Sequence, residues 1–167
     1  MRELLTIVIP SKNEDEYIYS TLKSISSQYF FNRVKIIIAD AGSTDNTLGE
    51  IKRAKIDFDL NIEVIEGGPV AVGRNRGASL ADTKYLCFID ADSLLLSKLI
   101  LIKCLMATEV RKYELVGCRV KSVSNDIPSK ISFSIFNIIQ RWFMREAFCT
   151  GMFFFISSEK FHQIGGL

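Results

Sequence analysis

Short apolar runs alternate with stretches in which apolar residues recur every three or four positions. The runs are rich in β-branched residues, which is typical of buried strands. The intervening stretches have helical spacing, as Ile18, Leu22 and Ile25 do, and the first is expected to carry acids in its first helical turn. The predicted strands are 4–10, 34–40, 61–67 and 84–92, and the predicted helices between them are 14–28, 41–55 and 69–82.

This order of elements predicts an α/β fold with a mostly parallel central sheet flanked by helices. Successive strands begin about 25 to 30 residues apart, the size of a strand–helix–strand unit. Their apolar residues are continuous rather than alternating, and such strands are buried on both faces, as in a parallel sheet.

The pattern changes after Asp92. The elements predicted there are a helix at 96–110, a strand at 113–123, a long amphipathic helix at 129–148, a strand at 151–158 and a short helix at 158–167. We therefore expect a single domain over 1–167, with a ligand-binding half, 1–95, and a second half, 96–167.

Composition narrows the class of protein. The chain has 167 residues, of which 48% are hydrophobic and 24% charged, a size and balance that suit one soluble globular domain. A formal net charge of +2, without a run of Lys and Arg, gives no reason to expect nucleic acid as a partner. The sequence shows no membrane-spanning run, no signal peptide and no closely spaced cysteines, so we expect a cytoplasmic protein with reduced thiols.

Polar side chains gather where the predicted strands end. Asn13 and Glu14 follow the first strand, Asp40 ends the second, and Asp90 and Asp92 end the fourth. In an open parallel sheet, ligands bind beyond the carboxyl ends of the strands, so these groups should lie along one edge. Carboxylates with a purely structural role have no reason to converge in this way.

The loop after the first strand excludes two nucleotide-binding patterns. It reads PSKNEDE and contains no glycine, so it is neither the glycine-rich turn of a dinucleotide fold nor a P-loop. Residues i and i+2 of an extended segment point the same way, so Asp90 and Asp92 can face one hard cation. Carboxylates with water and phosphate oxygens suit Mg²⁺ or Mn²⁺, which would bridge a diphosphate.

The chain resembles family 2 glycosyltransferases with the GT-A fold over nearly its whole length. The segments TIVIPSKNEDEYIYSTLKSI, IIIADAGSTDNT, VGRNRGAS and CFIDADSLL resemble the donor half of that family, and GMFFFISSEKFHQIGGL resembles its acceptor-side segment. The resemblance implies a donor half at 1–95 and an acceptor half at 96–167. It implies transfer of a sugar from a UDP- or GDP-sugar to a hydroxyl of a sugar, polysaccharide or lipid-linked acceptor, with inversion and with Mn²⁺ or Mg²⁺ as cofactor.

The resemblance also implies roles for individual residues. The implied nucleotide-binding residues are Pro10, Ser11, Glu14, Asp40, Arg74 and Asp90, and the implied metal ligands are Asp92 and Asp90. Within this set, Pro10, Ser11 and Glu14 would line the nucleoside pocket, and Asp40 would hydrogen-bond the base. Asp90 would lie near the ribose or sugar.

Several of these residues also have a structural interpretation. Glu14 fits a first-turn acid as well as a ligand contact. For Asp45 a helix-start role is favoured, and for Gly42 a role in the turn after the second strand. Arg74 is either a solvated helix charge or, as we favour, a cation beside the diphosphate.

The catalytic base has no secure candidate. The family commonly carries it in an acidic pair just after a Gly-Gly element, here Gly165 and Gly166, and the sequence ends at Leu167. We therefore expect the base beyond Leu167 and a truncated chain. For Glu159 a helix-start role is favoured over that of a substitute base, and for His162 a surface or packing role over catalysis.

Three other functions are alternatives to this assignment. A non-catalytic or truncated nucleotide-sugar binding module would explain the missing base and stays open. A nucleotidyltransferase would need a glycine-rich first loop bearing Lys or Arg. A phospho-acceptor signalling domain would place its principal acids after the first and third strands. The sequence disfavours both of these.

The predicted helix at 130–148 has two opposite faces. The apolar face carries Ile131, Ile135, Ile138, Ile139, Trp142 and Phe143, and the polar stripe carries Lys130, Ser134, Asn137, Arg141 and Arg145. Packing against the sheet or another subunit is the favoured interpretation. The alternative is peripheral contact with the inner face of an anionic membrane.

Overall fold

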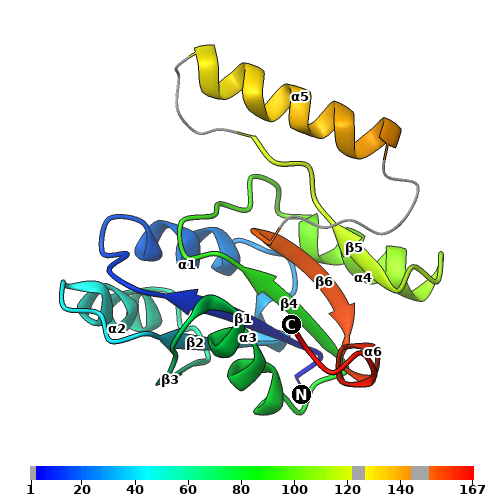
Figure 1. The fold of residues 1–167 in the computed structure, drawn as a ribbon. Helices are drawn as coiled ribbons and strands as arrows, with labels where there is room; N and C mark the ends of the chain where they lie inside the picture. The colour runs from blue at the N-terminus through cyan, green and yellow to red at the C-terminus, as the bar shows by residue number, and fades with distance from the viewer. Residues whose placement is uncertain (1–2, 122–126, 144–150) are drawn as a thin grey trace.

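Figure 1 shows the fold in a computed structural model, which describes residues 3–121, 127–143 and 151–167, without the side chains of 129, 130 and 140–143. The first half contains β1 (Leu5–Ser11), α1 (Ile18–Ser26), the 3-10 helix η1 (Phe31–Arg33), β2 (Val34–Asp40), α2 (Thr47–Asp57), β3 (Ile62–Glu66), α3 (Val70–Ser79) and β4 (Tyr85–Ile89). The second half contains α4 (Ile100–Glu109), β5 (Leu115–Gly117), α5 (Ile127–Phe143), β6 (Phe153–Ser157) and α6 (Ser158–Gln163).

The described strands form one sheet in the order β3-β2-β1-β4-β6-β5. The four strands of the first half are parallel, β6 is antiparallel to β4, and β5 is antiparallel to β6. The α/β fold with a mostly parallel sheet is thereby confirmed. The β4–β6 pairing also joins the two halves into one sheet, so their loops meet at shared edges.

Side chains of successive strand residues enter two cores on opposite faces of the sheet. Ile7 of β1 lies in a core with helices α1, α2 and α4, whereas Val8 lies in a smaller core with α3 and α6. Helix α3 approaches the sheet closely because Gly77 has no side chain. A Cβ at Gly77 would lie 2.4 Å from Cγ1 of Val8. The close approach of Gly77 to Val8 helps to place α3 beside β1 and β2.

Two local predictions are wrong. Helix α1 begins at Ile18, after the acids, so these do not form its first turn; the carbonyl of Glu14 accepts the N–H groups of Tyr17 and Ile18 instead. Of the strand predicted at 113–123, only β5 forms within the described residues 113–121, and residues 122 and 123 lie outside the described chain. Beyond β5, the N–H and C=O groups of Val120 bond the side chain of Asn137 rather than a neighbouring strand.

Helix α5 lies away from the sheet, above β5 and the start of β6 (Figure 1). Residues 129–143 of the helix predicted at 129–148 belong to α5. Residues 144–148 lie outside the described chain. Within the described ranges, no helix has the length and apolar character needed to cross a membrane.

Candidate active site

A pocket of about 570 Å³ lies at the carboxyl edge of the parallel strands. Its walls come from the ends of β1 and β4, the loop after β2 and the loop between β3 and α3. The lining residues are Pro10, Ser11, Lys12, Glu14, Ala41, Gly68, Pro69, Val70, Asp90, Ala91 and Asp92. The structure thus brings together five of the predicted site residues, Pro10, Ser11, Glu14, Asp90 and Asp92.

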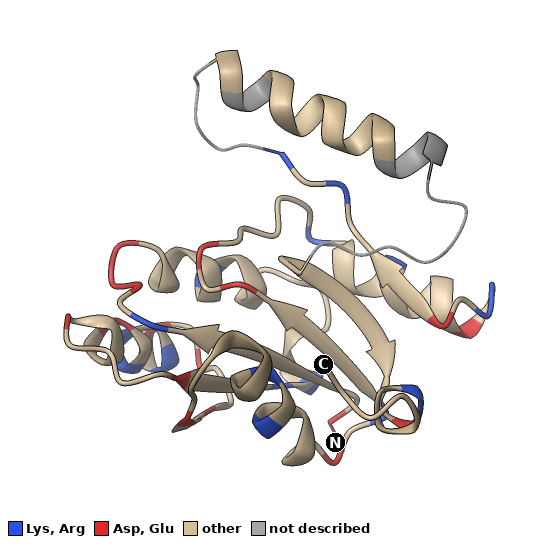
Figure 2. Ribbon diagram, viewed as in Figure 1, with Lys and Arg blue, Asp and Glu red and all other residues tan. Residues whose placement is uncertain are grey.

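Three carboxylates share this pocket. Burial raises the pKa of Glu14, and the negative charges of Asp92, Asp90 and Asp45 raise it further. Burial also raises the pKa of Asp90, although the neighbouring Arg74 opposes that change. Figure 2 shows acidic positions at the edge where β1 and β4 end. A group of carboxylates that repel one another in this way favours the binding of a cation.

Arg74 lies behind the pocket rather than in its lining. It is on α3 and only 9% exposed, so the interpretation as a solvated helix charge is wrong. Its Nη2 donates to Oδ1 of Asp90 at 2.6 Å and to the carbonyl oxygen of Gly151 at 2.6 Å. Its Nε is buried and has no hydrogen-bond partner among the described residues. Arg74 therefore orients Asp90 and ties it to the residues just before β6.

Asp40 ends β2 at the same edge but does not line the pocket. Its Oδ2 accepts the N–H groups of Gly42 at 3.1 Å and Ser43 at 2.9 Å, and its Oδ1 accepts the hydroxyl of Ser43 at 2.5 Å. Gly42 has a φ of +77°, which agrees with its predicted role in the turn. The carboxylate thus shapes the loop that forms one wall of the pocket.

The neighbouring polar residues join the loops after β1 and β2. Oδ1 of Asn13 accepts the N–H of Thr44 at 2.8 Å, and Thr47 donates its N–H to Oδ1 of Asp45 at 3.0 Å. Asp45 precedes α2 by two residues, so its predicted helix-start role is confirmed. Asn13 therefore holds the loop after β2 through this hydrogen bond and does not line the pocket.

Sequence reasoning missed one cation and one wall of the pocket. Lys12 lines the pocket among the acids, and Gly68, Pro69 and Val70 line it where α3 begins. The signal was present, because Gly68 and Pro69 follow the third predicted strand and so belong to the same edge.

Comparison with known proteins identifies the family. Residues 6–165 match the family described as Glycosyl transferase family 2. The chain belongs to this family. Among curated relatives, glycosyltransferase GlyG of Streptococcus pneumoniae is 33% identical over 103 residues, which is 60% of this chain and 34% of GlyG. The glucosyltransferase WfaP of Escherichia coli is 34% identical over 90 residues, which is 54% of this chain and 36% of WfaP. The chain thus spans about a third of the length of these relatives.

Solved structures share the GT-A fold of this family 2 domain. The mannosyltransferase PcManGT of Pyrobaculum calidifontis, in complex with GDP-Man and Mn²⁺, superposes with a TM-score of 0.77 at 22% identity, over 99% of this chain and 48% of that one. Staphylococcus aureus TarS 1–349, in complex with UDP-GlcNAc, gives a TM-score of 0.64 at 22% identity, over 74% of this chain and 36% of that one.

In this family 2 domain, the acceptor-side candidates Glu159 and His162 lie far from the pocket. Ser158, at the start of α6, donates its N–H to Lys84 and its hydroxyl to Thr83, both just before β4. The pocket lies at the other end of β4. Glu159 is exposed, occupies the first turn of α6 and accepts a bond from Gln163. The helix-start role is confirmed and the interpretation as a substitute base is wrong.

The donor set of the pocket fits one kind of metal site. Within the described ranges, no three His, Cys, Asp or Glu residues form a ready-made metal cluster. Mg²⁺ and similar hard ions are commonly held by one or two carboxylates, with water and substrate phosphates completing the shell. Asp90 and Asp92, with Glu14 nearby, match that pattern.

Proposed function

We propose that this family 2 domain transfers a sugar, with inversion and with the help of Mn²⁺ or Mg²⁺, from a UDP- or GDP-sugar to an acceptor hydroxyl. The observation that carries the proposal is the pocket at the carboxyl edge of the sheet, where Glu14, Asp90 and Asp92 converge. Two structural neighbours support the choice of donor, since PcManGT was solved with GDP-Man and Mn²⁺ and TarS with UDP-GlcNAc.

The predicted site residues have different proposed roles. Pro10 and Ser11 of β1, and Glu14 in the loop after it, contact the nucleoside, and Asp40 accepts hydrogen bonds from the base. Asp92 binds the metal, and Asp90 shares that role while lying near the ribose or sugar. Arg74 contributes by holding Asp90 and by placing a positive charge behind the diphosphate.

The proposed reaction is a single displacement. The acceptor oxygen forms a bond to the anomeric carbon while the bond from that carbon to the β-phosphate oxygen breaks. The nucleoside diphosphate leaves with the electron pair, and the acceptor proton passes to a carboxylate base. When bound, the cation neutralises charge that develops on the leaving diphosphate. We place the base beyond Leu167.

The direction of the chain near Leu167 is compatible with that placement. Asn75 of α3 donates to the carbonyl oxygen of Leu167 at 2.8 Å and accepts its N–H at 2.9 Å. The chain thus passes from α6, at the amino end of β4, to the middle of α3, whose first turn lines the pocket.

A second candidate function is nucleotide-sugar binding without catalysis. The observation that favours it is that Glu14, Asp90 and Asp92 are the only carboxylates lining the pocket among the described residues, and all three suit donor or metal binding. Mass-spectrometric detection of donor turnover separates the two. Binding with neither transfer nor hydrolysis, in a chain extended beyond Leu167, would favour the module.

We also propose cytoplasmic localisation, with peripheral contact of residues 130–148 at the inner face of an anionic membrane. In α5, the side chains of Ile127, Ile131, Ile135, Ile138 and Ile139 are between 41% and 71% exposed. Asn137 instead faces Val120. Residues 115–157 contain five basic side chains and two acidic ones. The basic residues are Arg119, Lys121, Lys130, Arg141 and Arg145, and the acidic residues are Asp126 and Glu146. An exposed apolar face within a cationic segment suits anionic lipid headgroups.

Vesicle co-sedimentation tests this contact. Binding to anionic vesicles should fall with added salt and should be lost when Ile135 and Ile138 are both changed to Ser. Ile56→Ser, at an isoleucine of α2 that is 72% exposed, is the control and should leave binding unchanged. Absence of binding at low salt would reject the membrane proposal.

The donor itself is tested by ligand-observed NMR with a panel of UDP-, GDP- and CMP-sugars in Mg²⁺. We expect a UDP- or GDP-sugar to give saturation transfer that free UDP or GDP abolishes by competition. No signal from any nucleotide-diphospho-sugar would contradict the proposed function.

A further inference from the structure

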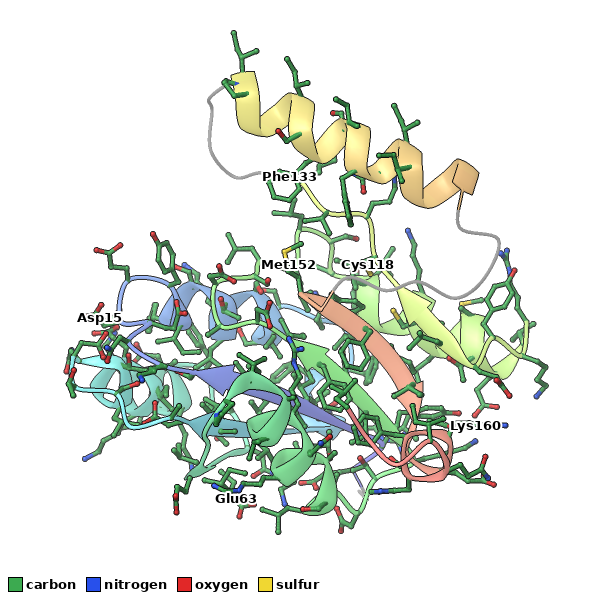
Figure 3. All side chains as sticks on the ribbon, viewed as in Figure 1. Asp15, Glu63, Cys118, Phe133, Met152 and Lys160 are labelled. Carbon is green, nitrogen blue, oxygen red and sulfur yellow. The ribbon has the colours of Figure 1, made fainter. Side chains whose placement is uncertain are left out.

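The two aspartates of the donor pocket that follow β4 are held in different ways. Arg74 orients Asp90 through its carboxylate, and the N–H of Asp90 donates to the carbonyl of Met152, just before β6, at 3.1 Å (Figure 3). The carboxylate of Asp92 has no hydrogen-bond or ion-pair partner among the described residues. The backbone on either side of Asp92 therefore sets the direction of its carboxylate.

Thr21 of α1 bonds the backbone directly before Asp92. Its Oγ1 donates to the carbonyl oxygen of Ala91 at 2.7 Å, and its side chain is fully buried. This carbonyl and the N–H of Asp92 belong to one planar peptide group, so a bond to the oxygen fixes the plane from which Asp92 extends. A threonine hydroxyl in a helix can bond a carbonyl of its own helix, but this one bonds a residue 70 positions away.

A second hydroxyl and an amide extend the contact between α1 and the loop after β4, which lie side by side in Figure 1. Oγ of Ser24 accepts the N–H of Leu95 at 3.0 Å and donates to the carbonyl of Thr21 at 2.7 Å. Gln28, just after the helix, donates to the carbonyl of Ser97 at 2.9 Å. Since α1 also packs into the larger core, these bonds tie the loop to a rigid element.

We propose that Thr21 is a positioning residue for the metal site. Through the carbonyl of Ala91 it sets the direction in which Asp92 presents its carboxylate to the cation, and Ser24 supports it by holding the loop at Leu95. Groups that orient a metal ligand commonly contribute about 10- to 100-fold to metal affinity. The inference rests on the proposed function, because only a metal-dependent donor site gives the direction of Asp92 a chemical consequence.

A purely structural role for Thr21 makes a different prediction. If its hydroxyl only satisfied a buried carbonyl, its removal would lower stability without acting selectively on the metal. The distinguishing quantity is therefore the gain in nucleotide affinity that the metal provides. It is obtained by calorimetry of UDP or GDP binding to the full chain, with Mg²⁺ and with chelator.

The test compares two substitutions of Thr21. Thr21→Val closely matches the shape of the side chain but lacks the hydroxyl, and it should weaken nucleotide binding about tenfold in Mg²⁺ and leave it unchanged in chelator. Thr21→Ser retains the hydroxyl and should recover most of the metal-dependent gain. A loss in Thr21→Val that is equal with and without metal, or no loss at all, would confine Thr21 to a structural role and overturn the proposal.

Thr83→Val is the matched control. Thr83 is also buried, and its hydroxyl also donates to a backbone carbonyl, that of Tyr85 at 2.9 Å, but at the amino end of β4. Thr83→Val should lower the melting temperature, as Thr21→Val does, and keep the full metal-dependent gain. Loss of the gain in Thr83→Val as well would attribute it to general destabilisation and overturn the proposal.

Two further outcomes complete the test. If Thr21→Val does not fold, Ser24→Ala decides: it should weaken nucleotide binding about threefold in Mg²⁺ alone, and unchanged affinity would overturn the proposal. A wild type that binds nucleotide equally with and without metal would reject the proposed function and this inference with it. A metal-dependent gain in the wild type that Thr21→Val retains would reject the inference alone.

Discussion

Nη2 of Arg74 lies 2.6 Å from Oδ1 of Asp90, and this ion pair connects the donor pocket to a second cavity, of about 450 Å³, that Met152 lines. The same nitrogen donates to the carbonyl of Gly151, and the N–H of Asp90 donates to the carbonyl of Met152 at 3.1 Å. Asp90 lines the donor pocket and Met152 lines the second cavity. A substitution of Arg74 should therefore alter both the donor pocket and the cavity lined by Met152.

Loss of Arg74 should destabilise the protein. In Arg74→Met the largely buried carboxylate of Asp90 and the carbonyl of Gly151 lose their partner, which should cost about 2 kcal/mol in the free energy of unfolding. Arg53→Met, which removes an exposed guanidinium from surface ion pairs, should cost about 1 kcal/mol at most. Urea unfolding measures both.

The pairing is tested by a double-mutant cycle. Asp90→Asn should be less harmful, or even stabilising, in the Arg74→Met background, because it removes a buried charge that no longer has a partner. Equal effects of Asp90→Asn in the two backgrounds would contradict the coupling.

Glu14 should reduce the stability of the metal-free protein at neutral pH. Its pKa is raised in the folded state by burial and by Asp92 and Asp90, so the folded protein binds this proton more tightly than the unfolded chain does. The stability linked to that proton is complete below about pH 4 and is lost as pH rises through the folded-state pKa.

Glu14→Gln should therefore raise the melting temperature at pH 7, by about 1 °C for a partly exposed group, and should leave it unchanged near pH 4. Glu16→Gln removes the same charge at an exposed position and serves as the control. The measurement is differential scanning fluorimetry with chelator. A lower melting temperature for Glu14→Gln at pH 7 would show that the carboxylate is stabilising instead.

Asp40 should act on the base rather than on the diphosphate. In the presence of Mn²⁺, Asp40→Ala should weaken UDP or GDP by about tenfold but leave pyrophosphate unchanged, because only the nucleotides carry a base. Since Asp40 also holds the loop at Gly42 and Ser43, Ser43→Ala is the control for loop disturbance. If both ligands weaken equally in calorimetry, Asp40 acts through the loop.

The parallel half of the fold was predictable because its strands are continuous apolar runs separated by helical periods. The bounds of β2 match the prediction, and Glu14, Asp90 and Asp92 meet where parallel strands must bring them. The partnership of Arg74 with Asp90 and Gly151 was not predictable, because it depends on β6 returning beside β4. For the same reason, residues 118–121, Phe133 and Met152 gave no sign in sequence that they share a cavity.

The central claim is that the carboxylate pocket binds a nucleoside diphosphate through a divalent cation, and calorimetry with Asp92→Asn tests it most directly. UDP or GDP should bind the wild type about tenfold or more tightly with Mn²⁺ or Mg²⁺ than with chelator, and Asp92→Asn should abolish that difference without altering thermal unfolding. Asp82→Asn, at an exposed position before β4, should behave as the wild type. Equal nucleotide affinity of the wild type with and without metal would contradict the account.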